Sequence, residues 1–324
     1  MQFTKRLLAA SAVIATAAGF AAAPASAAEK VDYLLPAPAF LPAFAPWQVA
    51  VARGYYAEEG LEITFQTAKG GVDVAKQVGV GNAPIGGAIG DTALLVRPNG
   101  IPVRSVALMG GGSLVQVVAR TDRGIDRVED LKGKTITVMS YQDTTFFAAQ
   151  GVLASRGLTR NDANIQAAGP QGIWKLLVDG KADAMMGVPD WIVIVQQQGV
   201  DVKVFNAKDY FPSMAQAIVA SDDLIAKNPK LIQGLVRASL KGLKAIMDDP
   251  EAAARDYVKA VPRWELPAML ATFKLFNQYT YEGQEVLGAM DETKLSQLQD
   301  FYLEAGFIKE KTPVKDLYTN QFVQ

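Results

Sequence analysis

Short apolar segments alternate with stretches of helical spacing along most of this chain, and this alternation constrains the fold more than any other feature. Such alternation is typical of α/β proteins built on parallel sheets. The predicted strands are residues 31–35, 61–66, 85–88, 103–108, 135–139, 165–168, 184–186 and 202–205. The predicted helices are residues 46–54, 72–80, 92–97, 144–156, 173–179, a segment from 191, and the chain from 222 to the end.

Part of this pattern occurs twice at a constant distance of 99 residues. Gly81-Asn82-Ala83, between a predicted helix and an apolar strand, is matched by Gly180-Lys181-Ala182 in the same setting. The same distance relates Asp91 to Asp190, and the strand that begins at Val103 to the one that begins at Val202. A shared offset across several short matches predicts two similar halves.

Two further apolar segments, residues 114–119 and 216–220, fit neither half of the repeat. We predict that they are strands that cross between the halves and form a hinge. The first lobe would then comprise residues 28–118 and 216–324, and the second lobe residues 119–215. The predicted fold is therefore a two-lobed α/β protein with a hinge of two crossing strands.

The first residues resemble an export signal. Lys5 and Arg6 precede an uncharged, alanine-rich run over residues 7–23, and Ala25-Ser26-Ala27 follows it. A basic start, a short apolar core and an A-x-A site are typical of a cleavable signal peptide. The alternative, a membrane anchor, needs about 20 strongly apolar residues. We therefore predict that residues 1–27 are a signal peptide and that the mature protein is periplasmic.

Composition excludes several functions. The chain has no His and no Cys, so it cannot build a metal site from imidazole or thiolate, a Ser-His-Asp triad, or a disulfide. Its 32 basic and 33 acidic residues nearly balance, and no long run of one charge favours nucleic acid. Carboxylate, Lys, Tyr and oxygen-ligated metal chemistry stay open. This composition argues against catalysis, and we expect no cofactor and no metal.

Loops that follow strands are the candidate binding loops, because ligands of parallel sheets collect at the carboxyl ends of the strands. The candidates in the first lobe are Phe40, Phe44, Trp47, Lys69, Asp91, Thr92 and Ser113. The three aromatic side chains either stack on a planar solute or close over the core of their own lobe. Lys69 also fits a solvated turn. The three glycines before Ser113 allow either close backbone approach or a hinge.

The candidates in the second lobe are Tyr141, Asp143, Thr144, Trp174, Asp190 and Trp191. Asp91, Asp143 and Asp190 all stand at predicted helix starts, where Asp is a preferred capping residue. Three carboxylates in the loops of one cleft would also repel a small anion from the helix N-termini that would otherwise hold it. The pattern favours a neutral or cationic, partly aromatic solute.

Three motifs resemble a known family. Residues 53–63 (RGYYAEEGLEI) resemble the G-Y-F-x-x-E-G-L-x-V stretch of periplasmic solute-binding proteins that serve ABC importers of the nitrate, sulfonate and taurine group, which includes a thiamine-pyrimidine branch. Residues 130–135 (DLKGKT) resemble the family's entry to its second lobe, and residues 180–184 (GKADA) resemble its G-x-x-D-A turn. The similarity runs over nearly all of the mature chain.

The resemblance implies a type II periplasmic binding fold, a small-molecule solute held between the lobes, delivery to an ABC permease of the inner membrane, and a monomer. Members of this family that bind anions commonly have Ser or Thr where this chain has Asp91 and Asp143. This departure favours a pyrimidine-like or aromatic solute.

Three alternatives stay open. One is an anion receptor for sulfonate, nitrate or taurine. Another is an enzyme of pyrimidine or menaquinone-precursor metabolism on the same fold, although such enzymes rely on His. The third is a ligand-sensing subunit that signals to a membrane partner.

Overall fold

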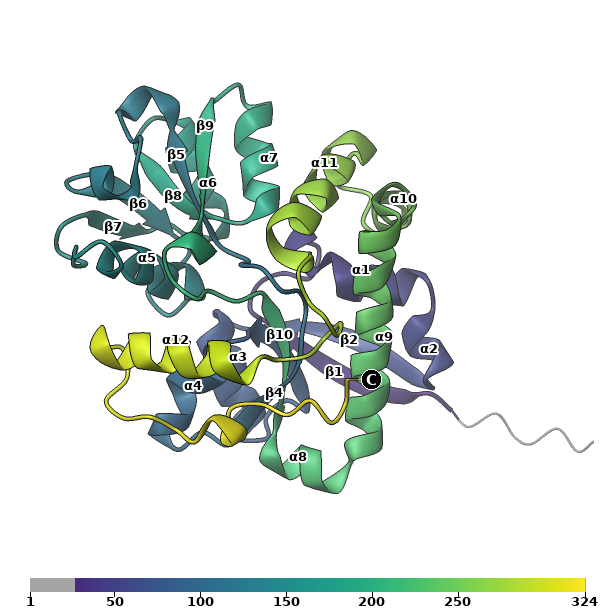
Figure 1. Ribbon diagram of the computed structural model, residues 1–324. Coiled ribbons are helices and arrows are strands. Elements are labelled where there is room, and N and C mark those ends of the chain that lie inside the picture. The colour runs from purple at the N-terminus through teal and green to yellow at the C-terminus, as the bar shows by residue number, and fades with distance from the viewer. Residues whose placement is uncertain (1–26, 324) are drawn as a thin grey trace, which may run out of the picture.

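Two five-stranded sheets form the framework of the computed structural model, which describes residues 27–323 (Figure 1). The first sheet has the order β2-β1-β3-β10-β4 and the second the order β7-β6-β8-β5-β9. The strands of the first sheet are β1 (Glu29–Leu35), β2 (Leu61–Thr67), β3 (Ile85–Ile89), β4 (Val103–Leu108) and β10 (Gln216–Ser221). Those of the second are β5 (Gln116–Arg120), β6 (Thr135–Val138), β7 (Asn164–Ala167), β8 (Ala184–Gly187) and β9 (Val202–Asn206). The predicted signal peptide lies outside the described residues, except for its last residue.

The two sheets share one topology, as the internal repeat predicts. In each sheet, three parallel strands are followed by an antiparallel strand and then by an edge strand. The antiparallel strand of each sheet comes from the segment that has just left the other sheet: β5 follows β4 along the chain, and β10 follows β9. The prediction of a two-lobed α/β fold with two crossing strands is confirmed.

Helices cover both faces of the sheets. They are α1 (Ala45–Ala52), α2 (Tyr55–Glu58), α3 (Gly71–Gly79), α4 (Thr92–Val96), α5 (Thr144–Ala154), α6 (Gly169–Val178), α7 (Pro189–Gln197), α8 (Asp222–Lys227), α9 (Pro229–Asp248), α10 (Pro250–Ala260), α11 (Leu266–Phe276) and α12 (Glu292–Glu304), with a π-helix η6 (Asn277–Tyr281). Because strands β3 and β10 are covered on both sides, every residue of each is buried, as expected of central strands in layered α/β proteins. No helix within residues 27–323 is long and apolar enough to cross a membrane.

The predicted helical tail is only partly correct. Helices α8 to α12 are present, but residues 305–323 run mainly as irregular chain after α12. Tyr318 forms a β-bridge with Ser105 in edge strand β4, and Thr319 N donates to the Ser105 carbonyl over 2.9 Å. The tail satisfies backbone groups that an edge strand would otherwise expose, which helical periodicity cannot reveal.

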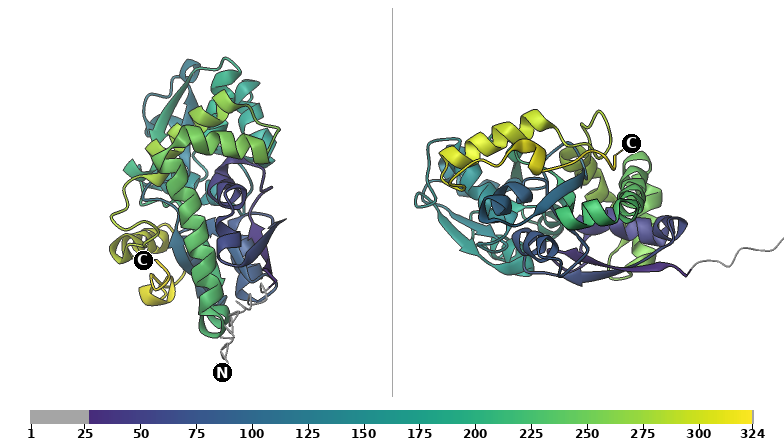
Figure 2. Two further views of the ribbon diagram at one scale, coloured as in Figure 1. Left: turned by 90° about the vertical axis from the view of Figure 1, so that its right-hand side faces the viewer. Right: turned by 90° about the horizontal axis from the view of Figure 1, so that it is seen from below.

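The tail helices bring the two parts of the molecule together. Helix α9 runs alongside the first sheet and packs on α1, and α10 and α11 continue toward the second sheet (Figures 1 and 2). There α11 packs against α7, which follows a strand of the second sheet. The tail helices that pack beside the first sheet therefore also contact helix α7 of the second.

The glycine triplet at residues 110–112 serves close packing within the protein. A Cβ atom on Gly110 would lie 2.1 Å from the carbonyl oxygen of Thr280, and one on Gly112 would lie 2.1 Å from that of Tyr279. Both neighbours are backbone atoms of η6, which have little room to shift. The sequence allows either close backbone approach or a hinge at this loop. The structure supports close backbone approach, and the backbone that approaches is that of η6.

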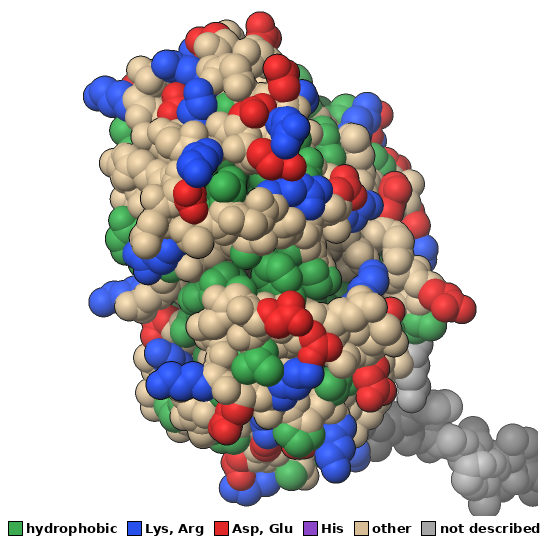
Figure 3. Space-filling view, turned by 60° about the vertical axis from the view of Figure 1, so that its left-hand side comes forward, with side chains coloured by type: hydrophobic (Ala, Val, Ile, Leu, Met, Phe, Trp, Pro, Cys, Tyr) green, Lys and Arg blue, Asp and Glu red, His purple; other side chains and the backbone are tan. Residues whose placement is uncertain are grey.

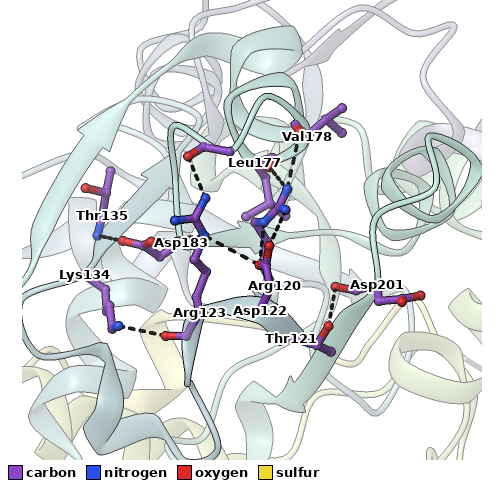
Figure 4. Close-up of polar contacts among 11 residues, drawn as sticks. Arg120, Thr121, Asp122, Arg123, Lys134, Thr135, Leu177, Val178, Asp183 and Asp201 are labelled. Carbon is purple, nitrogen blue, oxygen red and sulfur yellow. Dashed lines mark hydrogen bonds and ion pairs between the residues drawn. The ribbon is translucent and has the colours of Figure 1, made fainter.

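Two of the family-like motifs hold the second sheet together at the end of β5 opposite the crossing (Figure 4). Asp183 Oδ2 accepts a hydrogen bond from Thr135 N over 2.8 Å, which ties the loop before β8 to β6. Lys134 Nζ donates to the Arg123 carbonyl over 2.8 Å. These motif residues therefore have structural partners.

Candidate functional site

A small cavity, here called the inner pocket, lies between the two sheets where the crossing segments pass. It has a volume of about 60 Å³, room for only a few water molecules. Its walls are Pro36, Ala37, Leu41, Ala43, Phe44, Gly71, Ala88, Ile89, Leu114, Val115, Met139, Asp143, Thr144, Thr145, Val188, Asp190, Trp191 and Gln216. Most of these side chains are apolar. None of them is Lys or Arg.

The topology explains why these residues meet. Most of them stand at the carboxyl end of β3 or in the loops and first helical turns that follow β1, β2, β6 and β8, so the carboxyl ends of parallel strands from both sheets face one another across the inner pocket. Leu114, Val115 and Gln216 come from the two crossing segments, which form its floor. Figure 3 shows hydrophobic side chains gathered in the furrow between the two parts of the molecule.

Asp190 is the residue of the inner pocket with the most unpaired polar atoms in the described chain. It stands in the first turn of α7 and is 1% exposed, and neither of its carboxyl oxygens has a hydrogen-bond partner among residues 27–323. Burial raises its pKa from 3.8 to about 7. Its charge in turn adds to the effect of burial in raising the pKa values of Tyr257 and Tyr281. An unpartnered buried carboxyl is costly, so it is expected where a ligand completes the site.

Gln216 is a second polar residue of the inner pocket, and our sequence analysis did not select it. It opens β10, is 3% exposed, and its Oε1 has no hydrogen-bond partner in the described part of the chain. A polar residue at the start of an otherwise apolar crossing strand was the available signal. Asp190 and Gln216 together present a carboxyl group and an amide to the same small space.

Asp143 lines the inner pocket and also caps a helix. Its Oδ1 accepts from Thr145 N over 2.9 Å and from Thr145 Oγ1 over 2.7 Å at the start of α5. Burial raises the pKa of this carboxyl, and the two bonds from Thr145 act in the opposite direction. Thr144 lies beside it in the wall. The capping explanation therefore applies to Asp143, whereas Asp190 makes no capping bond.

Asp91, the repeat counterpart of Asp190, lies outside the wall of the inner pocket. It precedes α4 without a side-chain capping bond, and the Tyr302 hydroxyl on α12 donates to its Oδ2. Burial raises the pKa of Asp91 to about 6. The two related carboxyls therefore differ in surroundings: Asp91 holds the C-terminal helix, and Asp190 faces a cavity.

A second cavity, here called the outer pocket, adjoins the first and has a volume of about 220 Å³. Leu41 and Trp191 stand in the walls of both cavities. The remaining walls of the outer pocket are Pro38, Phe40, Pro170, Gln171, Trp174, Ile194, Arg263 and Trp264. The structure thus brings Phe44, Asp143, Thr144, Asp190 and Trp191 to the inner pocket, and Phe40, Trp174 and Trp191 to the outer one.

The other predicted residues do not line either cavity. Trp47 is fully buried, and its Nε1 donates to Tyr33 Oη over 2.8 Å, so it closes over the core of its own sheet. Ser113 Oγ donates to the Val115 carbonyl over 2.8 Å.

The remaining three also lie elsewhere. Thr92 Oγ1 accepts from Ile89 N over 3.1 Å, inside the turn before α4. Lys69 is exposed in a turn, and Tyr141 is 54% exposed. Their sequence positions place these residues in loops after strands or at the helix starts that follow, but the direction of each side chain is set by packing.

The groups of the combined site are suited to binding a small molecule. It offers apolar and aromatic surface, one carboxyl that titrates near neutral pH, one free amide oxygen, and no cation in the inner pocket. Within residues 27–323 no three acidic side chains are placed to share a metal ion. Such a site suits a ring with hydrogen-bonding edges.

Known proteins with similar sequences include binding proteins and synthases. The chain is 29% identical over 289 residues to the riboflavin-binding protein RibY of Chloroflexus aurantiacus, covering 86% of this chain and 82% of that protein. It is 25% identical over 209 residues to the formylaminopyrimidine-binding protein of Halalkalibacterium halodurans, covering 63% of each. It is 22% identical over 315 residues to the 4-amino-5-hydroxymethyl-2-methylpyrimidine phosphate synthase of Uromyces fabae, covering 91% of this chain and 88% of that protein.

The fold is also shared with a solved structure. The alkanesulfonate-binding protein SsuA from Xanthomonas axonopodis pv. citri, bound to MOPS, superposes with a TM-score of 0.72 at 14% identity, covering 91% of this chain and 98% of that chain. At this identity the likeness concerns the fold alone. The family model described as NMT1/THI5 like matches residues 41–253, and this chain therefore belongs to the NMT1/THI5-like family.

Proposed function

We propose that this protein is a solute-binding receptor that holds a neutral heteroaromatic molecule with a pyrimidine-type ring between its two lobes. The observation that carries the proposal is Asp190, whose two carboxyl oxygens are buried in the wall of an apolar cavity without a protein partner in residues 27–323. A solute that pairs with this carboxyl removes the cost of leaving it unpaired.

Pyrimidine-type rings match the groups on offer. Carboxyl and amide side chains recognise the edges of heterocyclic bases because the edge carries adjacent donors and acceptors. With a pKa near 7, Asp190 accepts a hydrogen bond when ionised and donates one when protonated. Riboflavin and formylaminopyrimidine, which appear in the names of two relatives, both contain a pyrimidine ring.

An anionic solute fits the inner pocket less well. Its wall contains no Lys or Arg, so a sulfonate or nitrate would be buried without a charged partner. Repulsion by carboxylates contributes less than the sequence suggests, because Asp190 is largely protonated below pH 7. The absence of Lys and Arg from the wall is therefore a stronger argument for a neutral solute than repulsion by carboxylates.

We further propose that residues 28–118 with 216–324, and residues 119–215, act as two lobes that open and close about the crossing segments. A cavity of about 60 Å³ requires the lobes to separate before a ring can enter. Phe44, Asp143, Thr144, Asp190, Trp191 and Gln216 would contact the solute in the closed state.

The remaining proposals concern the protein's surroundings. Its relatives named as binding proteins and its signal-like N-terminus support a periplasmic protein that delivers solute to an ABC permease. We propose that it acts as a monomer. One relative is named as a synthase, so the alternative that this protein is an enzyme on the same fold also needs a test.

Native mass spectrometry of protein purified without denaturation tests the receptor proposal. We expect a bound small molecule that contains a pyrimidine ring and is recovered chemically unchanged. Titration with riboflavin and with 4-amino-5-hydroxymethyl-2-methylpyrimidine should quench Trp fluorescence and raise the melting temperature. Recovery of a sulfonate or nitrate would contradict the proposed solute class, and conversion of a bound solute to product would support the enzyme alternative.

Asp91→Asn should leave solute affinity within about twofold of wild type, although the sequence pattern selects Asp91 as a binding residue. The amide keeps an oxygen that can accept from the Tyr302 hydroxyl, and Asp91 does not reach the inner pocket. Fluorescence titration with riboflavin checks this. A tenfold loss of affinity with an unchanged melting temperature would show that Asp91 contacts the solute.

A further inference from the structure

The outer pocket is built by segments from both lobes and from the tail. Phe40 comes from the loop after β1, Trp174 from α6, Trp191 from α7, and Arg263 and Trp264 from the connection between α10 and α11. Its position next to the inner pocket, with Leu41 and Trp191 in both walls, means that one molecule can extend from one cavity into the other.

Phe40 is held in place at this wall by three contacts. The Trp264 Nε1 and the Tyr257 hydroxyl each donate to its carbonyl oxygen over 2.8 Å. The Arg263 guanidinium lies 3.8 Å from the centre of its ring. Three contacts on one loop residue make the wall rigid before any solute arrives, which lowers the entropy cost of binding.

The chemistry of the outer pocket is that of a stacking site. Phe40, Trp174 and Trp264 are only half-buried, so aromatic surface is left for a further ring. Arg263 is exposed and has no ion pair with an acid in residues 27–323, so its N–H groups are available to a carbonyl or hydroxyl substituent. Aromatic side chains and guanidinium planes are the surfaces on which planar heterocycles stack.

We propose that the outer pocket is a second subsite of the same solute site, and that the solute is a fused, polycyclic heteroaromatic rather than a single pyrimidine ring. This inference rests on the receptor function proposed above. The pyrimidine edge of the solute pairs with Asp190 and Gln216 in the inner pocket. The fused rings extend past Trp191 and stack on Trp174, with their polar substituents toward Arg263.

Binding of two probes to wild type and to paired variants tests the proposal. The probes are riboflavin, whose pyrimidine ring is fused to two more rings, and the single-ring 4-amino-5-hydroxymethyl-2-methylpyrimidine. We expect riboflavin to bind at least tenfold more tightly. Trp174→Ala should weaken riboflavin about tenfold or more and leave the single-ring probe within twofold, because each lost stacking contact affects only the fused rings. Trp174→Phe should restore most of the riboflavin affinity.

The outcomes separate this inference from the receptor function. If both probes bind, Asp190→Asn weakens both, and Trp174→Ala weakens neither or both equally, then the outer subsite is overturned and the receptor function stands. If neither probe binds and no heteroaromatic molecule is recovered with the protein, the proposed function falls and this inference falls with it. Melting temperatures of the Trp174 variants within a few degrees of wild type exclude unfolding as the cause.

Discussion

Asp190→Asn is expected to stabilise the solute-free protein and to weaken solute binding in the same variant. Wild-type Asp190 is 1% exposed, and neither of its oxygens has a partner in the described chain, so its ionised form is strongly disfavoured in the folded state. An amide of the same shape carries no charge to bury. The variant also loses the carboxyl that pairs with the solute, and we expect an affinity loss of roughly 10- to 100-fold at pH 7.5.

The stabilisation should depend on pH in a defined direction. Burial raises the pKa of Asp190 from 3.8, its ordinary value, to about 7 in the folded protein. Between these values the folded state keeps a proton that the unfolded state has lost, so raising the pH favours unfolding. The advantage of the variant should therefore be absent near pH 4, grow up to pH 7 and stay constant above it, reaching about 4 kcal/mol.

Denaturant unfolding of both proteins at several pH values measures this difference, and fluorescence titration with riboflavin measures affinity. Asp91→Asn is the matched control, because Asp91 is the repeat counterpart of Asp190 and is also a buried acid with a raised pKa. The control should gain stability at neutral pH without losing affinity. If Asp190→Asn binds riboflavin as wild type does, Asp190 does not contact this solute.

Gly242→Ala and Gly234→Ala, two identical changes in helix α9, should have opposite effects on stability. A Cβ atom on Gly242 would lie 2.0 Å from the Pro46 carbonyl oxygen and 3.1 Å from Ala50 N, both backbone atoms of α1. Because neither atom can move without shifting α1, we expect a loss of about 3 kcal/mol or more in unfolding free energy. On Gly234 the nearest atom would be Glu59 Cβ at 3.4 Å, an ordinary contact. The helix preference of Ala should then make Gly234→Ala neutral or stabilising by up to about 1 kcal/mol.

Thermal unfolding checks the pair, with the melting temperature of Gly242→Ala falling by roughly 6–12 °C. Both residues lie in the same helix and are buried, so a general effect of Ala in α9 would move both variants alike. Equal melting temperatures would show that the contact between α9 and α1 is not rigid. The result also bears on the site, because α1 directly follows Phe44 in the wall of the inner pocket.

The sequence predicts the elements of this fold well. All eight predicted strands and both crossing segments occur, because short apolar runs between turn residues are a local signal. Helix starts were less accurate: α6 begins at Gly169, before the predicted start at residue 173, because Pro170 favours the first turn of a helix. The helical tail was overextended where the chain pairs with an edge strand.

The sequence by itself determined the two-lobed α/β architecture and the loops in which a site can lie, since strand and helix periodicity depend on neighbouring residues. It also identified the carboxyls related by the repeat, Asp91 and Asp190, as a pair. Only the tertiary structure separated them. Tyr302, far along the chain, pairs with one oxygen of Asp91 and leaves the other without a partner in the described chain, whereas both oxygens of Asp190 are unpaired beside Gln216 in the inner pocket. Whether a buried polar group is satisfied depends on which distant segments pack against it, and local sequence does not contain that information.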